Sequence, residues 1–450
     1  MNDSLIIRDK RYLINTFTTD LTTGEVQFEL LTDFRVSIDL QEVNTFIGGV
    51  SSTISTDSLL ATKLGISVSA ISKFSIDGSN ISCRIEGNYN IPASAFANNT
   101  NITYFNDSDG LVNTINITAF YGCTALSYVE FPNVTNIISS SAGGISGTFQ
   151  NCTTLTSFLV PNLTSITGGN SFLGCSNLVT FSAPNLVGSI PTQSFQNLSN
   201  LINFTSGNIT KVESNAFLNC IKLESINLNY CTQIEASAFS GCSALNSIVG
   251  LNACTIINSY AFYNCVKLPT FTTNAITTIG EAAFYRCLLI TEYNFPVLTT
   301  FSTSTGAGTR GTFQGNTALI NFIAPNLTSI TGTGNGFSGC SNLVTFSAPN
   351  LAGVIGLYMW QNCSQLVNFT VGGVTSINDG CFNGCSLISS IYIPSLTVCG
   401  STNLNNLVFN NIKSGITITV SSALQTNNSG SPDGDLQYAI TTRGATVTYI

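Results

Sequence analysis

Apolar residues recur along most of this chain with a period of about 23 residues. Each copy begins at an aromatic anchor, and successive anchors lie 22 to 29 residues apart. The thirteen anchors are Phe96, Phe120, Phe149, Phe172, Phe195, Phe217, Phe239, Phe262, Phe284, Phe313, Phe337, Trp360 and Phe382. A period in this range is typical of a solenoid, in which each copy buries its apolar face against its neighbours.

Three further apolar columns follow each anchor. Three residues on, ten copies carry Cys, and Asn99, Leu198 and Asn316 are the exceptions. Six residues on, every copy is aliphatic, and nine residues on, every copy carries a large apolar or aromatic residue. The i, i+3, i+6 spacing predicts a short helical or 3₁₀ turn. The alternation around the last column, as in Thr180-Phe181-Ser182, predicts a strand.

The fold class predicted from these columns is a β-rich solenoid of about 13 coils over residues 91–408. Prolines such as Pro184 end the strand, because proline donates no hydrogen bond to a neighbouring strand. We therefore expect each coil to contain a short helical turn, a strand, a corner and a second extended segment.

The array of repeats also contains a longer internal repetition. CSNLVTFSAPNL occurs at 175–186 and again at 340–351, and corresponding anchors are 164 or 165 residues apart. We infer a duplicated block of seven repeats. The two 29-residue spacings contain Gly/Ser/Thr-rich insertions before Thr148 and Thr312, which we expect to bulge from the same edge of the rod.

The two ends differ from the middle. Residues 1–90 contain half of the charged residues, and segments such as GEVQFELL, FRVSIDL and KFSIDGSNISCRIEG alternate with period two. We interpret residues 1–90 as a small β-rich attachment domain. Residues 409–450 are expected to form a β cap with a strand at 416–420, a polar loop at 426–434 and a last strand at 445–450, because terminal repeats need caps.

Composition narrows the classes of function. Only 8% of residues are charged and the net charge is −8, without a long Lys/Arg run, so no nucleic-acid partner is expected. No apolar run approaches 18 residues, and the charged N-terminus lacks the apolar core of a secretory signal. We therefore expect neither a membrane span nor a standard signal peptide.

The chain has 15 cysteines and no histidine. Ten cysteines share one phase of the repeat, which predicts a buried column of free thiols in a protein that folds under reducing conditions. The lack of histidine removes Ser-His and Cys-His nucleophile pairs and the commonest transition-metal ligand. No paired C-x₂-C zinc knuckles occur. We expect no cofactor, no metal and no catalytic residue.

Glu213 and Glu235 are a candidate pair of facing carboxylates, because each lies four residues before an anchor and the two are in adjacent coils. Their carboxylates could stack about 5 Å apart, which is the separation of a retaining glycosidase pair. Stacked carboxylates could also bind a cation. Lys211 and Lys222 are nearby, so a solvated charge cluster is the plainer interpretation.

The better candidate surface is the outward side of the strands, one residue before and after the last column. Hydroxyl and amide groups there can hydrogen-bond a glycan or a protein, although small polar residues also simply suit exposed strands. The candidate binding residues are Tyr128, Glu130, Asn203, Asn227, Glu292, Asn294, Asn321, Asn368 and Tyr392.

AFLNCIKLESINL at 216–228 and AFSGCSALNSI at 238–248 resemble the BspA-like leucine-rich repeats. The resemblance covers roughly residues 91–408 and implies a right-handed leucine-rich-repeat array. The chain departs from the usual family form in its strand Phe residues and its Pro-Asn corners. The C-terminal segments SGITITVSSALQ and GDLQYAITTRGATVTYI are similar to C-terminal segments of tailed-phage structural proteins.

These observations lead to one hypothesis and one alternative. The hypothesis is a non-enzymatic virion protein of a phage, such as a fibre, decoration or host-attachment protein, folded in the host cytoplasm. Its N-terminal domain would bind other virion proteins, its solenoid would bind a host surface protein or glycan, and a homo-oligomer is compatible with it. The alternative is a bacterial cell-surface adhesin of the BspA-like kind.

Overall fold

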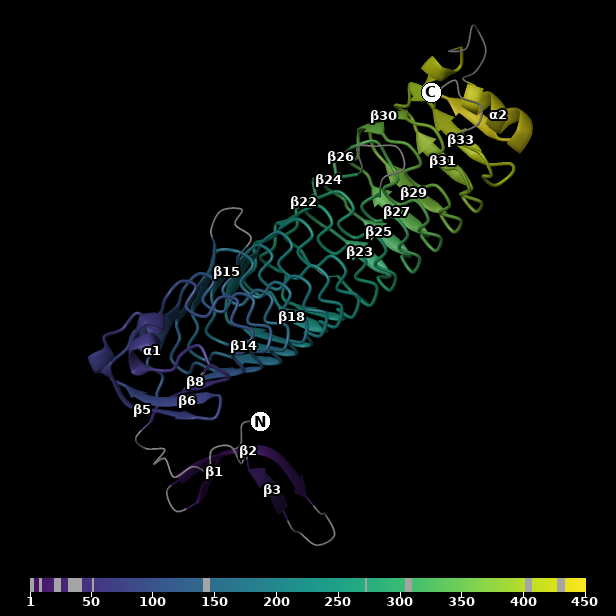
Figure 1. The fold of residues 1–450 in the computed structure, drawn as a ribbon. Helices are drawn as coiled ribbons and strands as arrows, with labels where there is room; N and C mark the ends of the chain where they lie inside the picture. The colour runs from purple at the N-terminus through teal and green to yellow at the C-terminus, as the bar shows by residue number, and fades with distance from the viewer. Residues whose placement is uncertain are drawn as a thin grey trace.

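The chain forms a long rod of stacked coils (Figure 1), seen in a computed structural model. The structure describes residues 43–50, 52–140, 146–271, 273–303, 310–400, 407–426 and 434–450, and the backbone of 4–7, 10–19 and 26–30. The predicted strand FRVSIDL and most of the two insertions and of the loop at 426–434 lie outside the described residues. The solenoid has about 14 coils, which confirms the predicted fold class.

One side of the rod is built from the strands around the last apolar column. Corresponding residues pair in parallel from coil to coil, as Phe158 does with Phe181 and Phe181 with Phe204. These strands are β8 (Tyr104–Asp107), β10 (Tyr128–Glu130), β12 (Ser157–Leu159), β14 (Thr180–Ala183), β16 (Asn203–Ser206), β18 (Ser225–Asn227), β20 (Ser247–Val249), β23 (Glu292–Asn294), β25 (Asn321–Ile323), β27 (Thr345–Ala348), β29 (Asn368–Val371), β31 (Ser390–Ile393), β33 (Thr417–Val420) and β34 (Thr446–Tyr449). We call the outward side chains of these strands the strand face.

A second side is built from the extended segment that follows each corner. Seven of its strands, from β15 to β26, form one continuous parallel sheet. The strands of this side are β7 (Tyr89–Ile91), β9 (Val112–Ile115), β11 (Asn136–Ile138), β13 (Ser165–Thr167), β15 (Gly188–Ile190), β17 (Ile209–Val212), β19 (Gln233–Ile234), β21 (Ile256–Ile257), β22 (Thr278–Ile279), β24 (Thr300–Ser302), β26 (Ser329–Thr331), β28 (Gly353–Ile355), β30 (Val374–Ile377) and β32 (Val398–Cys399).

The third side, which we call the turn side, contains the anchors and the residues just after them. Successive i→i+3 backbone bonds form there, as from Cys152 N to Phe149 O and from Leu155 N to Cys152 O. The residue two positions after each anchor has a left-handed φ, which prevents these turns from joining into a regular helix. The predicted helical segment is therefore a series of 3₁₀-type turns.

The interior consists of side-chain columns that run along the rod. The anchor rings stack from coil to coil, with Phe149 and Phe172 5.3 Å apart and their planes 2° apart. Rings of the strand column meet them edge to face, as Phe158 meets Phe172 at 4.8 Å. All ten column cysteines are buried, and all 15 cysteines are free. The predicted buried column of free thiols is confirmed.

The Pro-Asn corner has a structural role of its own. Asn185 Nδ2 donates to the carbonyl of Pro161 in the preceding coil at 2.9 Å, and Asn350 makes the same bond to Pro325 at 2.8 Å. Because proline cannot continue the backbone ladder as a donor, the asparagine amide supplies a bond between coils at this corner.

The N-terminal end of the rod is closed by residues that share its core. β4 (Thr45–Gly48) pairs antiparallel with β8 of the first coil and with β6 (Asn80–Ile85), and β5 (Ile71–Asp77) lies outside β6. α1 (Asp57–Leu64) packs here, with Thr56 as its N-cap and η2 (Val68–Ala70) after it. Residues 43–91 thus act as a cap. Before them, β1 (Ser4–Ile7), β2 (Lys10–Thr19) and β3 (Val26–Leu30) form an antiparallel sheet.

The solenoid continues one coil beyond the thirteenth anchor. Phe409 stacks on Phe382, and β33 pairs in register with β31. The C-terminal end then contains η3 (Ser422–Leu424), β34 and α2 (Gly434–Arg443), a helix that the sequence pattern did not predict. Asp435 of α2 is buried and accepts a hydrogen bond from the backbone N–H of Val408 at 3.0 Å, which closes the last coil.

Candidate functional site

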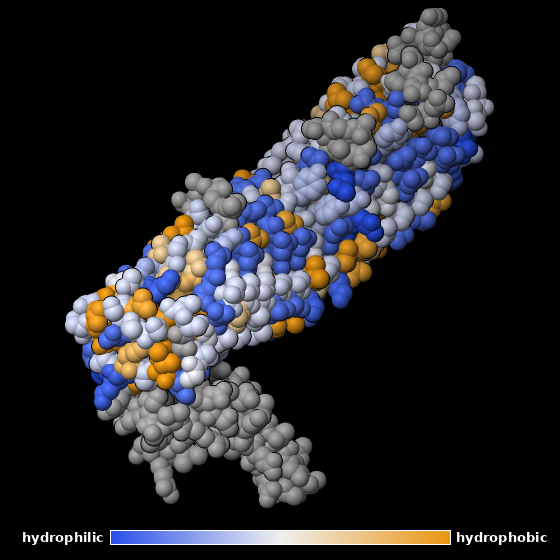
Figure 2. Space-filling model, in the orientation of Figure 1, coloured by the Kyte–Doolittle hydropathy of each residue, from blue (hydrophilic) through white to orange (hydrophobic). Residues whose placement is uncertain are grey.

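The strand face carries two rows of short polar side chains. Register places Glu292, Asn321, Thr345 and Asn368 in one row of four coils. The residues two positions further along each strand form the other row, which is polar except at Ile323 in these coils. Parallel pairing in register places equivalent residues next to one another within each sheet of this side, such as β12-β14-β16 and β23-β25-β27-β29. Figure 2 shows a mostly blue and white surface with scattered orange side chains. The surface is suited to hydrogen bonding along its length.

All nine predicted binding residues are half-buried or exposed on this face. Several of them bond to one another: Tyr128 donates to Glu130 Oε2 at 3.0 Å, and Asn321 Nδ2 donates to Glu292 Oε2 at 3.4 Å. Burial and the neighbouring Glu130 carboxylate raise the pKa of Tyr128 well above its usual value. Tyr128 therefore remains a neutral hydrogen-bonding group.

The other predicted residues differ in whether their side-chain polar atoms already make a hydrogen bond within the protein. Asn368 Nδ2 donates to Thr345 Oγ1 at 3.4 Å, and Asn227 Oδ1 accepts from the backbone N–H of Asn229 at 3.1 Å. Within the described part of the chain, the side chains of Asn203, Asn294 and Tyr392 make no hydrogen bond, and Tyr392 is 58% exposed. These three are the residues most available to a ligand.

Glu213 and Glu235 have separate partners. Glu213 Oε2 accepts from the backbone N–H and the hydroxyl of Thr192, at 3.0 and 3.1 Å. Glu235 bonds Lys211 Nζ at 2.7 Å and accepts from Asn258 Nδ2 at 2.7 Å. Glu213 also lines a polar cavity of about 650 Å³. Among the described residues no group of three or more His, Cys, Asp and Glu side chains could hold a metal ion. The arrangement favours structural hydrogen bonding over acid–base catalysis.

Sequence reasoning missed an aromatic and cationic cluster on the turn side. Tyr263 and Tyr285 stack with their ring centroids 4.8 Å apart, and the guanidinium of Arg310 lies 5.1 and 5.7 Å from the two centroids. Tyr260 lies against Tyr263 and donates to Glu281 Oε1 at 3.2 Å. The cluster mixes residues one position after an anchor with residues before an anchor, so no single column indicates it.

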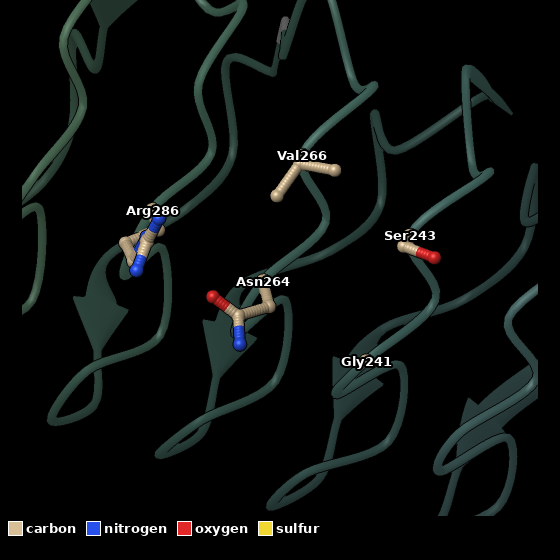
Figure 3. A pocket seen from close by; sticks show the side chains of 5 residues that line it. All are labelled: Gly241, Ser243, Asn264, Val266 and Arg286. Carbon is tan, nitrogen blue, oxygen red and sulfur yellow. The ribbon is translucent and has the colours of Figure 1, made fainter.

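A pocket of about 350 Å³ lies on the turn side between three coils. Figure 3 shows Gly241, Asn264 and Arg286 at equivalent places of successive coils, with Ser243 and Val266 beside them. The left-handed position two residues after the anchor is Asn or Gly in thirteen of fourteen coils, and Arg286, with φ 55°, is the exception. The sequence alone could have indicated this exception, because the other thirteen coils carry asparagine or glycine at the same position of the repeat.

No helix among the described residues is both long and apolar enough to cross a membrane. No curated protein sequence matches the chain. Among solved structures, a leucine-rich repeat protein from Bacteroides ovatus ATCC 8483 is 18% identical, with 97% of this chain and 98% of that chain covered and a TM-score of 0.57. This likeness shows a shared fold.

Two further solved structures are less similar. A leucine rich cell surface protein from Faecalibacterium prausnitzii A2-165 is 20% identical, covering 81% of this chain and 90% of that chain at a TM-score of 0.38. A leucine rich repeat protein from T. pallidum is 24% identical, covering 35% and 72% at a TM-score of 0.30.

The family model described as the BspA type leucine-rich repeat region matches in six copies, over residues 56–143, 89–220, 145–245, 210–309 and 309–430. These matches cover most of the chain and include nearly all of the coils. The chain belongs to the BspA-type leucine-rich repeat family.

Proposed function

We propose that this protein is a non-enzymatic binding rod whose strand face contacts the surface of a bacterial host. The observation that carries the proposal is the pair of mostly polar rows on the strand face, which include free side-chain groups at Asn203, Asn294 and Tyr392. Solenoids present extended surfaces of this kind to their ligands. Amide and hydroxyl groups in regular rows offer many weak hydrogen bonds to a glycan or protein without requiring charge.

We further propose that the protein acts as a structural or adhesion component of a phage particle. The support is the large set of free, buried thiols, which suits folding in a reducing compartment such as the cytoplasm in which particles assemble. Residues 1–42, which hold a third of the charged residues, would attach the rod to other virion proteins. The alternative is a bacterial cell-surface adhesin.

Mass spectrometry of purified particles and of washed cell envelopes tests the location. Enrichment in particles is expected, and enrichment in envelopes alone would favour the adhesin. Deletion of residues 1–42 should abolish incorporation while the cap at 43–91 keeps the rod folded. Normal incorporation of that deletion would refute the attachment role.

A charge scan tests the strand face with washed host envelopes as the binding probe. Thr205→Glu and Thr370→Glu place a carboxylate among the polar rows, and each should weaken binding at least tenfold. Val354→Glu is the matched control, because Val354 is exposed on β28 of the second side. Equal binding by all three variants and the parent would contradict the strand face as the contact surface.

A further inference from the structure

We propose that the turn side around Arg286 is a second binding site, which takes an acidic saccharide, that is, a sugar bearing a carboxylate or a sulfate group. The site lies away from the strand face, at the pocket of Figure 3, and does not depend on the function proposed for that face.

The first observation is the backbone of Arg286. Left-handed φ values cost little for glycine and are tolerated best by asparagine among other residues, which explains the residues at the equivalent position of the other thirteen coils. A second left-handed position lies two residues before the anchor, and it accepts other residue types such as Thr118. At the position of Arg286, the other thirteen coils carry only asparagine or glycine. Every coil has a left-handed backbone at this position, so the observation that points to a function is the presence of arginine where the other coils carry asparagine or glycine.

The contacts of the Arg286 side chain within the described part of the chain do not explain the choice of arginine. The side chains of Arg286 and Arg310 make no hydrogen bond or ion pair with any residue that the structure describes, although the backbone N–H of Arg286 donates to Gln314 O at 3.0 Å. The next coil leaves room for the long side chain, because a Cβ at Gly315 would lie 3.2 Å from Arg286 Cγ. The guanidinium of Arg286 therefore keeps its donors for a ligand.

The second observation is the pocket that Arg286 lines. It is a shallow surface hollow of about 350 Å³, open to solvent on one side. Ser243 and Asn264 supply neutral donors and acceptors, Val266 supplies an apolar wall, and none of the five lining residues is acidic. A sugar ring needs this mixture, since it carries hydroxyl groups and an apolar C–H surface together.

The third observation is the local charge. The chain carries a net charge of −8, yet Arg286, Arg310 and Lys267 lie within or beside this part of the turn side, where Glu281 is the carboxylate that Tyr260 bonds. The planar guanidinium binds carboxylate and sulfate oxygens in a forked arrangement. Arg310 is already positioned by the stacked pair Tyr263 and Tyr285, whose faces attract a cation. The anionic group of the saccharide is expected to meet Arg286.

The internal duplication provides the matched comparison. In the first seven-coil block, Gly122 stands where Arg286 stands in the second, Ala97 where Tyr263 stands, and Ser146 where Arg310 stands. Arg286→Gly therefore restores a residue that the rod already uses and removes the strained backbone. A ligand-binding role predicts lost binding with unchanged or increased thermal stability.

The experiment measures binding of the full chain to oligogalacturonate, dextran sulfate, neutral dextran and poly-L-glutamate by biolayer interferometry. At least one of the two acidic saccharides should bind, and neutral dextran and poly-L-glutamate should bind at least tenfold more weakly. Arg286→Gly should weaken saccharide binding at least tenfold. Lys222→Gln removes one positive charge on another coil, where Lys222 Nζ bonds Asn200, and should bind as the parent does.

Four results would overturn the proposal. They are failure of both acidic saccharides to bind better than neutral dextran, parent-like binding by Arg286→Gly, an equal loss in Lys222→Gln, and poly-L-glutamate binding as tight as that of the saccharides. A fall in the melting temperature of Arg286→Gly would assign Arg286 a structural role instead. None of these results bears on the strand face, whose test uses other residues.

Discussion

The side-chain amide of Asn316 donates a hydrogen bond to the phenolic oxygen of Tyr293 at 3.2 Å, inside a core that is apolar at both positions in most other coils. Asn316 occupies the cysteine column, and Tyr293 occupies a column of Phe, Ile and Val. Asn316 Oδ1 also accepts from the backbone N–H of Cys287 at 2.8 Å. Two departures from the repeat therefore satisfy each other, as buried polar groups must.

Tyr293→Phe should destabilise the protein because it leaves the Asn316 amide buried without its acceptor, at a cost of about 1–3 kcal/mol. Asn316→Cys should do the same to the Tyr293 hydroxyl. The double variant restores the common residues at both positions, so it should lose less stability than the sum of the single variants. Urea unfolding of the four proteins checks this, and strict additivity would show that the two residues are not coupled.

The interior of the fold could be predicted because every coil must bury apolar side chains at the same positions of the repeat. The four columns are visible as periodic apolar positions, and Phe181 or Leu178 in one coil indicates the same place in the next. The compensation between Tyr293 and Asn316 could not be predicted in the same way. It depends on which side chains of adjacent coils face each other, and spacing alone does not show this. The helix α2 was missed because residues 434–443 carry little amphipathic pattern.

The cysteine column is held by hydrogen bonds between coils. Each of the ten Sγ atoms approaches the carbonyl oxygen of the anchor in the preceding coil, as Cys175 Sγ does with Phe149 O at 3.0 Å. Burial raises the pKa of Cys123 and of Cys340 to about 12. The thiolate is the reactive form of cysteine, so both groups are inert at neutral pH.

Thiol titration should therefore separate the folded and unfolded protein. At pH 8 the native chain should react with few or no equivalents of a thiol reagent, and the denatured chain should show close to 15 without added reductant. Rapid modification of the native rod would contradict burial of the column. A low count after denaturation would show disulfide bonds instead.

Alkaline pH should destabilise the rod through the same thiols. The folded pKa of about 12 for Cys287 and Cys385 lies above the ordinary value of 9.0, so folding favours the protonated form. The stabilisation is complete below pH 9 and is lost as the pH rises towards 12, because only the unfolded chain can ionise freely. Urea midpoints should fall steadily between pH 9 and 11. Cys385→Ala should reduce the slope, and an unchanged slope would point to other groups.

As with the fold, one candidate site could be predicted from the sequence and the other could not. The outward positions of the strands follow from alternation, so Asn203 and Tyr392 could be placed on one face from the sequence. The importance of Arg286 rests on a backbone angle and on a side chain without a described hydrogen-bond or ion-pair partner, which are properties of the folded chain. Arg310 meets Tyr263 and Tyr285 only because an insertion places it beside their coils.

Asp107 gives the fold a pH dependence in the acid range. It is buried at the end of β8, where its two carboxyl oxygens accept from the backbone N–H groups of Leu111 and Val112 at 3.0 and 2.8 Å. Burial raises its pKa to about 6, and the nearby carboxylates Asp109 and Glu130 add to the shift against the two hydrogen bonds. Tyr89 also faces it and stays neutral, because burial raises its pKa.

Because the folded pKa lies above the ordinary value of 3.8, Asp107 stabilises the fold when it is protonated. This contribution is complete below about pH 4 and is lost as the pH rises through 6, and it amounts to on the order of 3 kcal/mol. Asp107→Asn stays neutral at every pH, so its free energy of unfolding should change less between pH 4 and 7 than that of the parent. Asp77→Asn, at an exposed position of β5, is the control, because Asp77 is not among the groups that shift the pKa of Asp107. Parallel pH profiles for the parent and Asp107→Asn would mean that Asp107 does not titrate in this range.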